Sequence, residues 1–310
     1  LNGHAIKIDK LIREAELSQK GFERLREAVD QQLSSTYKET FSLTKRALFD
    51  LVSDQVSYAY QNLETAVGKI WRTERPPKRV AEEIVLDTPL HGDTRLEAGW
   101  SNIAIGERKR LEAVIRKGIA EGKTVDQIAL EVRRGNVHNI SRNQAKGLVV
   151  TAITATATQA DHSVYKANEK ALQGWQYVAV LDARTTPICA HRDGEIYAIN
   201  DKTHLPPAHF HCRSTTVPVF KSWQQMAELE GVAQVRKENI ANLSKKQIAF
   251  YDGQTPLRET YSDWLARQPK DVQFRHLGDY KKVEMFNNGQ LELSQFTNPE
   301  GNSVGIKELR

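Results

Sequence analysis

The sequence predicts a mostly helical α+β fold, with long N-terminal helices, a central domain of helices and a small sheet, and a mixed C-terminal tail. Apolar residues recur at helical spacing through most of residues 1–160. Two short β-prone runs, 175–181 and 215–220, enclose a polar loop rich in Cys and His. Pro and Gly then interrupt residues 255–310. With 39 % apolar residues, the 310-residue chain has enough hydrophobic side chains for a folded core.

Residues 1–75 predict two or three long helices. Leu25, Val29 and Leu33 follow one another at helical spacing, and no proline occurs before Pro76. Such a stripe cannot bury a large core by itself. We therefore expect this segment to pack on the rest of the chain or on a partner.

Residues 76–100 predict a linker, because Pro, Gly and mixed charges break the helical pattern there. We place a central domain at 101–220 and a C-terminal extension at 221–310. The extension is expected to open with a helix over residues 222–251.

Two capping-box patterns lie in the central domain. In each, a Ser or Thr stands three residues before a Gln, as in Thr124–Gln127 and Ser141–Gln144. Both patterns predict the start of a helix. Residues 151–158 should continue the second helix, although their β-branched side chains have low helix propensity.

Composition excludes several classes of protein. The longest stretch without a charged residue, 147–160, is too short to cross a bilayer. Lys7, Asp9 and Lys10 precede any apolar run, so no signal peptide is expected. Two cysteines cannot build a disulfide-rich scaffold, and the composition is typical of an intracellular protein.

Positive charge is concentrated in residues 101–150, where ten Lys and Arg face five Asp and Glu. This local excess of +5 equals the net charge of the whole chain. Two interpretations stay open: ordinary solvated helix faces, or a surface that contacts DNA phosphates. The candidate DNA-binding residues are Arg108, Lys109, Arg110, Arg116, Lys117, Arg133, Arg134, Arg142 and Lys146.

The loop between the two predicted strands holds both cysteines and four of the nine histidines. Thiolate and imidazole groups at short spacing are zinc ligands, so Cys189, His209 and Cys212 are candidates, with His191 or His211 as a fourth. A Cys189–Cys212 disulfide and simple packing of the side chains are the alternatives. No cofactor is certain, and zinc is the candidate.

Asp182 and Asp193 of the same loop have expected structural roles. Asp182 and Arg184 stand at the strand exit and are expected to tie the loop by charge-assisted hydrogen bonds. Asp193–Gly194 predicts a turn in which glycine supplies a positive φ.

These residues resemble the signature of the phage Mu F-like head morphogenesis proteins, also called minor head or minor capsid proteins. The matching motifs are Asp182-Ala-Arg184-Thr185, Cys189, Asp193-Gly194, Pro206-Pro207-Ala208-His209 and Cys212-Arg213. The resemblance extends upstream to about Ile103 and downstream into the C-terminal part of the chain. Many members of that family carry further cysteines where this chain has Thr186 and Ser214, which removes two candidate zinc ligands.

The resemblance implies a non-catalytic structural protein of a tailed phage or prophage. Such a protein resides in the virion, inside the head near the portal, and in the host cytoplasm during assembly, without a membrane step. Its implied partners are the portal protein, capsid or scaffold proteins, and packaged double-stranded DNA, with a role in packaging or ejection. Residues 1–75 are then the candidate portal-docking segment. We expect a chain without them to fold but to lose portal binding.

Two other functions remain as alternatives. One is a metal-dependent nuclease or hydrolase that uses the Cys189–Cys212 loop. Against it, the loop has only three acidic residues that could hold a hard cation, Asp193, Glu195 and Asp201. The other is a DNA-binding module of non-viral function.

Overall fold

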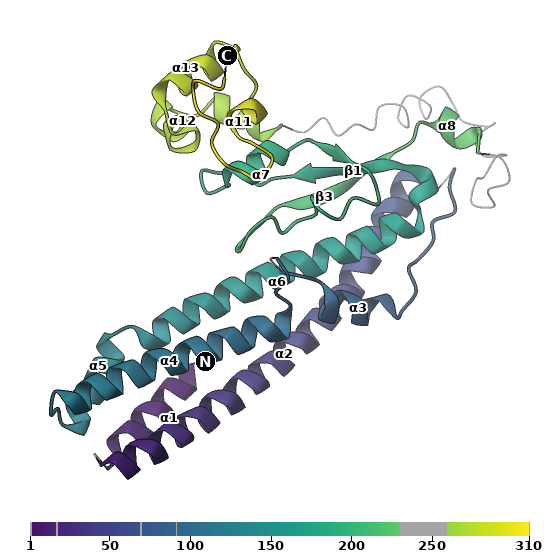
Figure 1. Ribbon diagram of the computed structural model, residues 1–310. Coiled ribbons are helices and arrows are strands. Elements are labelled where there is room, and N and C mark those ends of the chain that lie inside the picture. Colours follow the sequence, from purple (N-terminus) through teal and green to yellow (C-terminus); the bar gives the residue numbers. More distant parts are fainter. Residues whose placement is uncertain (1, 17, 69, 91, 230–258, 310) are drawn as a thin grey trace. The chain divides into compact units, whose positions relative to one another are not determined.

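The fold is known from a computed structural model that describes residues 2–16, 18–68, 70–90, 92–229 and 259–309 (Figure 1). The chain forms two compact units. Unit 1 comprises Leu1–Leu51 and Glu82–Thr156, and unit 2 comprises Val52–Ala81 and Ala157–Arg310. Each unit contains residues from more than one of the segments predicted from the sequence. The boundaries of those predicted segments stay a prediction. The mostly helical α+β class is confirmed.

Unit 1 is a bundle of long helices that run side by side in Figure 1. Its elements are α1 (Asn2–Arg13), the first part of α2 (Gln19–Val67), most of α3 (Val80–Asp87), α4 (Leu96–Ala120), α5 (Val125–Arg134) and the first part of α6 (Val137–Ala167). The predicted N-terminal helices are thus α1 and α2. Their stripes are buried as expected, with Leu25, Val29 and Leu33 each at most 6 % exposed.

Two local predictions in unit 1 had different outcomes. The first capping box is confirmed, because the Thr124 hydroxyl accepts from the Gln127 N–H and the Gln127 side chain accepts from the Thr124 N–H. The second is wrong. Ser141 is buried inside α6, and its hydroxyl donates to the Val137 carbonyl at 3.3 Å, a bond to the preceding turn that competes with capping. The helix therefore begins earlier, at Val137, and continues through residues 151–158 as predicted.

Unit 2 is built on a three-stranded antiparallel sheet in the order β2-β1-β3. Its elements are the last part of α2, the end of α6, the turn η1 (Glu169–Ala171), β1 (Leu172–Val178), α7 (Pro187–Arg192), β2 (Ile196–Tyr197), β3 (Thr215–Phe220), α8 (Trp223–Ala227), α11 (Tyr261–Ala266), α12 (Lys270–Leu277), α13 (Tyr280–Asn287) and the turn η2 (Leu293–Phe296). Both predicted strands are present as β1 and β3.

Three segments differ from their predictions. The proposed linker contains the helix α3, whose Ile84 and Val85 are buried. The loop between β1 and β3 contains the short helix α7 and the strand β2. The helix expected over 222–251 is interrupted, because α8 ends at Ala227 and the next two residues are not helical. Residues 230–258 lie outside the described part.

The described residues of unit 2 form two apolar cores. The larger surrounds Trp71, Trp175 and Tyr177, each at most 1 % exposed. The smaller joins α7 to the C-terminal helices through Ala190, Tyr261, Leu265 and Phe296. Because Ile70 and Trp71 belong to the larger core, removal of residues 1–75 would open that core. We therefore no longer expect a chain without residues 1–75 to fold.

No helix in the described part of the chain combines the length and the apolar character needed to span a membrane.

Gly174 in β1 supplies a test of the sheet. A Cβ built there would lie 2.3 Å from the Tyr197 carbonyl oxygen on β2, which cannot move without breaking the strand pair. We expect Gly174→Ala to destabilise the protein by about 1–3 kcal/mol in urea denaturation. Gly3→Ala in α1 is the control, because no atom lies within 4 Å of its Cβ position. Equal effects of the two substitutions would contradict the close approach of β1 and β2.

Candidate metal centre

Cys189, His209 and Cys212 of unit 2 meet in one place, named here the Cys/His cluster. Cys189 lies on α7, which begins with Pro187 at its first position, where a missing N–H costs nothing. His209 and Cys212 belong to the turn before β3, in which the Cys212 N–H donates to the His209 carbonyl at 3.1 Å. Both thiols are buried. Packing of the two segments on the sheet brings together residues that are 23 positions apart.

The distances within the Cys/His cluster are short. Cys189 Sγ lies 3.8 Å from Cys212 Sγ and 3.2 Å from His209 Nε2. The Tyr177 hydroxyl, on β1, donates to Cys189 Sγ at 3.2 Å. Tyr177 was not among the site residues predicted from the sequence. The available signal was its position in the predicted strand 175–181, which leads directly into the loop.

The ring of His209 is oriented by its own backbone neighbour. Nδ1 lies 2.7 Å from the Phe210 carbonyl oxygen. Because a carbonyl only accepts, Nδ1 carries a hydrogen, and Nε2 is the nitrogen that faces the sulfurs. The Thr186 hydroxyl lies 2.8 Å from Nε2. Thr186 precedes α7 as its N-cap but makes no capping bond with its side chain.

The two thiols titrate as a pair. The hydrogen bond from Cys189, supported by one from His209, lowers the pKa of the Cys212 thiol. The hydrogen bond to Cys212 and burial together raise the pKa of Cys189. The hydrogen bond with Cys212 also raises the pKa of His209. The Cys/His cluster thus favours a thiolate on Cys212, and a thiolate is the form of cysteine that binds metals.

The signature residues around the Cys/His cluster form a structural frame. Asp182 accepts two hydrogen bonds from Arg213, at 2.6 and 2.7 Å, and one from the Arg184 N–H at 2.9 Å. The bonds from Arg213 are the main reason that the pKa of Asp182 is well below its usual value. Thr185 donates to the Val180 carbonyl. The predicted tie of the loop by Asp182 is present, and Arg213 is its main partner.

Asp193 and Gly194 form the predicted turn, with Gly194 at a φ of 86°. The Asp193 carboxylate also joins two segments that are distant in sequence. It accepts from the Ala179 N–H at 2.6 Å and from the Tyr261 N–H, at the start of α11, at 2.7 Å.

His191 does not join the Cys/His cluster. Its Nδ1 donates at 2.9 Å to the carbonyl of Ser294, a residue of the C-terminal turn η2. His211, the other candidate for a fourth ligand, is exposed and has a φ of 62°. The structure therefore brings together three of the four predicted ligands.

The nine candidate DNA-binding residues lie on α4, α5 and α6 of unit 1, and five of them contact other side chains. Arg108 and Arg133 form ion pairs with Asp30 and Asp9, at 3.7 and 3.5 Å. Lys117 lies 3.8 Å from Glu121, and Arg110 donates to Ser141 at 2.8 Å. The guanidinium of Arg116 lies over the Phe22 ring, 5.5 Å from its centroid.

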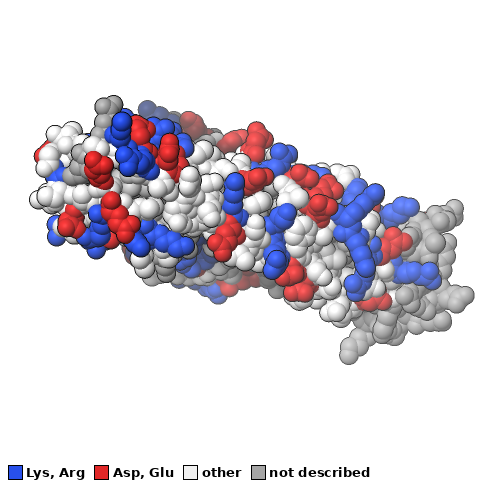
Figure 2. All heavy atoms as spheres, turned by 90° about the horizontal axis from the view of Figure 1, so that it is seen from below, with Lys and Arg blue, Asp and Glu red and all other residues white. Residues whose placement is uncertain are grey.

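The other four are exposed and have no ion pair among the described residues: Lys109, Arg134, Arg142 and Lys146. On the face shown in Figure 2, blue and red side chains are interspersed and do not form a surface of one sign.

A buried polar cluster in unit 1 was not predicted from the sequence. Glu107 of α4 is fully buried and accepts from His4 at 2.9 Å, His138 at 2.6 Å and Tyr37 at 2.5 Å. Burial acts to raise the pKa of Glu107, but the hydrogen bonds from His138, His4 and Tyr37 outweigh it and lower that pKa well below its usual value. A signal was present, since Glu107 stands between Ile103 and Leu111 on the buried stripe of α4.

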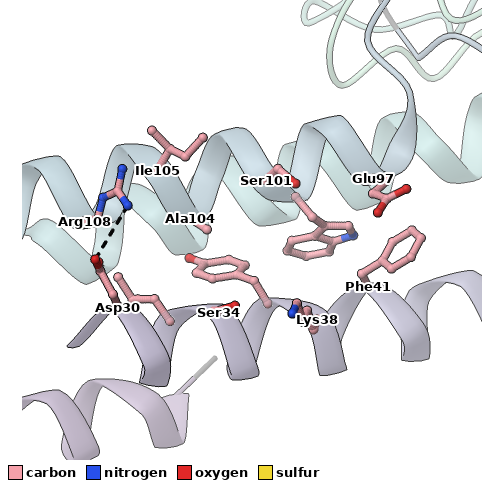
Figure 3. Close-up of a pocket in the computed structure, with 12 residues that line it drawn as sticks. Asp30, Ser34, Lys38, Phe41, Glu97, Ser101, Ala104, Ile105 and Arg108 are labelled. Atoms are coloured by element: carbon pink, nitrogen blue, oxygen red, sulfur yellow. Dashed lines mark ion pairs between the residues drawn. The ribbon is translucent and has the colours of Figure 1, made fainter. Parts of the chain in front are cut away.

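Tyr37 also lines a groove between α2 and α4 (Figure 3). The groove has a volume of about 370 Å³. Phe41 and Ile105 contribute apolar walls, and the Asp30–Arg108 ion pair lies at one end. Because the Tyr37 hydroxyl is bound to Glu107, the buried cluster fixes one side chain of the groove.

Comparison with protein families identifies the segment that contains the Cys/His cluster. Residues 109–217 match the family model described as phage Mu protein F like protein. Comparison with curated proteins gives no match, and comparison with solved structures gives none. The matched segment includes every signature residue from Asp182 to Arg213. It confirms the resemblance to the phage Mu F-like family over residues 109–217, where the chain carries a phage Mu protein F-like segment. The upstream and downstream extensions of the resemblance stay a prediction.

Proposed function

We propose that this protein is a minor head protein of a tailed phage or prophage, bound at the portal vertex inside the head. It acts in head morphogenesis, contacts packaged DNA without sequence specificity and catalyses no reaction. The observation that carries the proposal is the match of residues 109–217 to the phage Mu F-like family.

The roles of the signature residues support a structural function. Asp182 and Arg213 are bound to each other, and Asp193 is bound to backbone N–H groups of two segments. Each of these side chains makes intramolecular hydrogen bonds that hold the fold. Residues with such roles maintain a shape, which is what an assembly protein requires.

The location of the protein tests the proposal directly. We expect mass spectrometry of purified virions to find the chain at a few copies per particle, and portal rings of the same phage to retain the purified chain. A ring protein of similar size and charge from another source is the control for nonspecific retention. Absence from virions together with equal retention by both rings would refute the proposal.

The nuclease alternative has its own test. The assay is nicking of plasmid DNA in the presence of a divalent metal. Nicking that requires the metal and is lost in His209→Ala would favour the enzymatic function over the structural one. We expect no nicking by the purified chain.

DNA binding is proposed for the exposed basic residues that have no ion pair among the described residues. The triple substitution of Arg134, Arg142 and Lys146 by Ala should weaken binding to duplex DNA and lower the slope of log K against log salt by up to about 3, near 0.9 for each lost phosphate contact. Fluorescence anisotropy at several salt concentrations measures both quantities.

The matched control replaces Lys202, Lys270 and Lys281 of unit 2, which are equally exposed. It removes the same charge from the chain, so it isolates the effect of position from that of net charge. Equal losses in both variants would contradict a localised DNA-binding surface.

A further inference from the structure

We propose that Cys189, Cys212 and His209 bind one Zn²⁺ ion, whose fourth ligand is a water molecule or the Thr186 hydroxyl. The sequence left zinc, a disulfide and simple packing as alternatives. The arrangement of the side chains favours zinc. A water molecule or the Thr186 hydroxyl then takes the place predicted for His191 as the fourth ligand.

The spacing of the ligand atoms fits a tetrahedral zinc site. Zn–S bonds of about 2.3 Å place two sulfur ligands about 3.8 Å apart, and Zn–N bonds of about 2.0 Å give an S···N separation of about 3.5 Å. The observed separations are 3.8 Å between the sulfurs and 3.2 Å between Cys189 Sγ and His209 Nε2. The side chains need only small shifts to enclose the ion.

The surroundings of the ligands also suit a metal. The Nδ1 hydrogen of His209 is bonded to the Phe210 carbonyl, and this hydrogen bond directs Nε2 to the ion. Two thiolates and a neutral imidazole give a net charge of zero with Zn²⁺, so the buried site leaves no uncompensated charge. Zinc binds both cysteines as thiolates, so their thiol hydrogens leave as protons when the ion binds.

A small cavity provides the fourth position. It has a volume of about 20 Å³, and Thr186, Cys189, His209 and Ser214 are among its lining residues. This is enough for one water molecule. The Thr186 hydroxyl already reaches His209 Nε2 at 2.8 Å, so an ion bound to Nε2 would lie close to this oxygen.

The second group of potential ligands fails the same test of spacing. In the cluster of His4, Glu107 and His138, both ring nitrogens lie 2.6–2.9 Å from a single carboxylate oxygen. Nitrogen and oxygen ligands of zinc stand about 3.4 Å apart at tetrahedral angles. Those side chains are therefore hydrogen-bonded to one another, and only the Cys/His cluster has the separations of a ligand shell among the described groups.

The experiment measures metal content and cobalt spectra of the full-length chain, purified under reducing conditions. We expect about one zinc per chain and, after exchange with Co²⁺, the charge-transfer absorption of two thiolate ligands. Cys212→Ser and His209→Ala should each weaken zinc binding at least 100-fold in competition with a chromophoric chelator. His191→Ala, on the same loop, is the matched control and should bind zinc as the unmodified chain does.

A gain-of-function variant keeps the test independent of misfolding. Thr186→Cys places a third thiolate at the fourth position, so we expect at least 10-fold tighter zinc binding and about half as much again of the thiolate–cobalt absorption. Circular dichroism checks that each variant is folded.

Three results would overturn the proposal. The first is a folded, reduced chain that binds no zinc at micromolar concentrations. The second is a thiol titration that finds Cys189 and Cys212 joined as a disulfide in the native protein. The third is a Thr186→Cys chain with unchanged affinity and spectrum.

Discussion

Replacement of Glu107 by alanine is expected to destabilise unit 1 by about 3–5 kcal/mol, which is the usual cost of breaking a buried charged network. The carboxylate is fully buried and accepts hydrogen bonds from His4, His138 and Tyr37. Its removal leaves two buried donors, His4 and Tyr37, and the partly buried His138 without their acceptor, and it opens a cavity beside α4. Urea denaturation followed by circular dichroism measures the loss.

Glu112 supplies the control on the same helix. It is partly exposed and lies 3.7 Å from Arg26, the geometry of a surface ion pair. Glu112→Ala should therefore change the stability by no more than about 1 kcal/mol. Similar losses for the two glutamates would show that Glu107 is not the centre of a buried network.

The same network predicts how stability depends on pH. Because the pKa of Glu107 is lower in the folded protein than its ordinary value of 4.5, ionisation of this group stabilises the folded state above about pH 4.5. This contribution is lost as the pH falls from there toward the folded-state pKa. The difference in free energy of unfolding between the unmodified chain and Glu107→Gln should accordingly shrink below about pH 4.5. A difference that grows on acidification would contradict the lowered pKa of Glu107.

Asn168 is expected to show the second large effect, a loss of about 3–5 kcal/mol in unit 2 on replacement by alanine. This amide is fully buried at the end of α6. Its oxygen accepts from Trp71 Nε1 at 3.0 Å and from the Glu74 N–H at 2.8 Å, and its nitrogen donates to the Glu74 and Val164 carbonyls at 2.8 and 2.9 Å. Unsatisfied buried groups cost about 1–3 kcal/mol each.

A double-mutant cycle isolates part of this effect. Trp71→Phe removes one of the donors to Asn168, so its loss and that of Asn168→Ala should add up to more than the loss in the double variant. Asn143→Ala, at an exposed position of α6, is the control and should stay within about 0.5 kcal/mol. Full additivity would contradict the coupling.

Local patterns were predicted well from the sequence. The stripe of α2, the capping box at Thr124 and the strands β1 and β3 depend on residues within a few positions of one another. The box at Ser141 was wrong because the same pattern also suits a buried serine bonded to its preceding turn. Spacing alone cannot separate the two, since tertiary burial decides between them.

Long-range pairs could be predicted only in part. The loop composition pointed to Cys189, His209 and Cys212, yet it could not tell which histidine would be brought to the cysteines. The short helix α7 turns His191 toward Ser294, while the turn before β3 brings His209 to Cys189. The cluster around Glu107 joins residues that are distant in sequence, such as His4, which lies 103 positions before Glu107. The one local signal was a charged residue on an otherwise apolar stripe of α4.

The two hydrogen bonds of Asp193 bear on how the family segment can be studied in isolation. The matched residues 109–217 begin inside α4 and end inside β3, whereas Asp193 binds the N–H of Tyr261, well beyond that end. Ala190 likewise packs in a core whose other buried members follow residue 260. A recombinant fragment cut at the family boundaries would thus expose apolar surface and lack the Tyr261 N–H that the Asp193 carboxylate binds. The segment matched by the family model is shorter than the part of the chain that must fold together. Complementation experiments should therefore exchange whole chains.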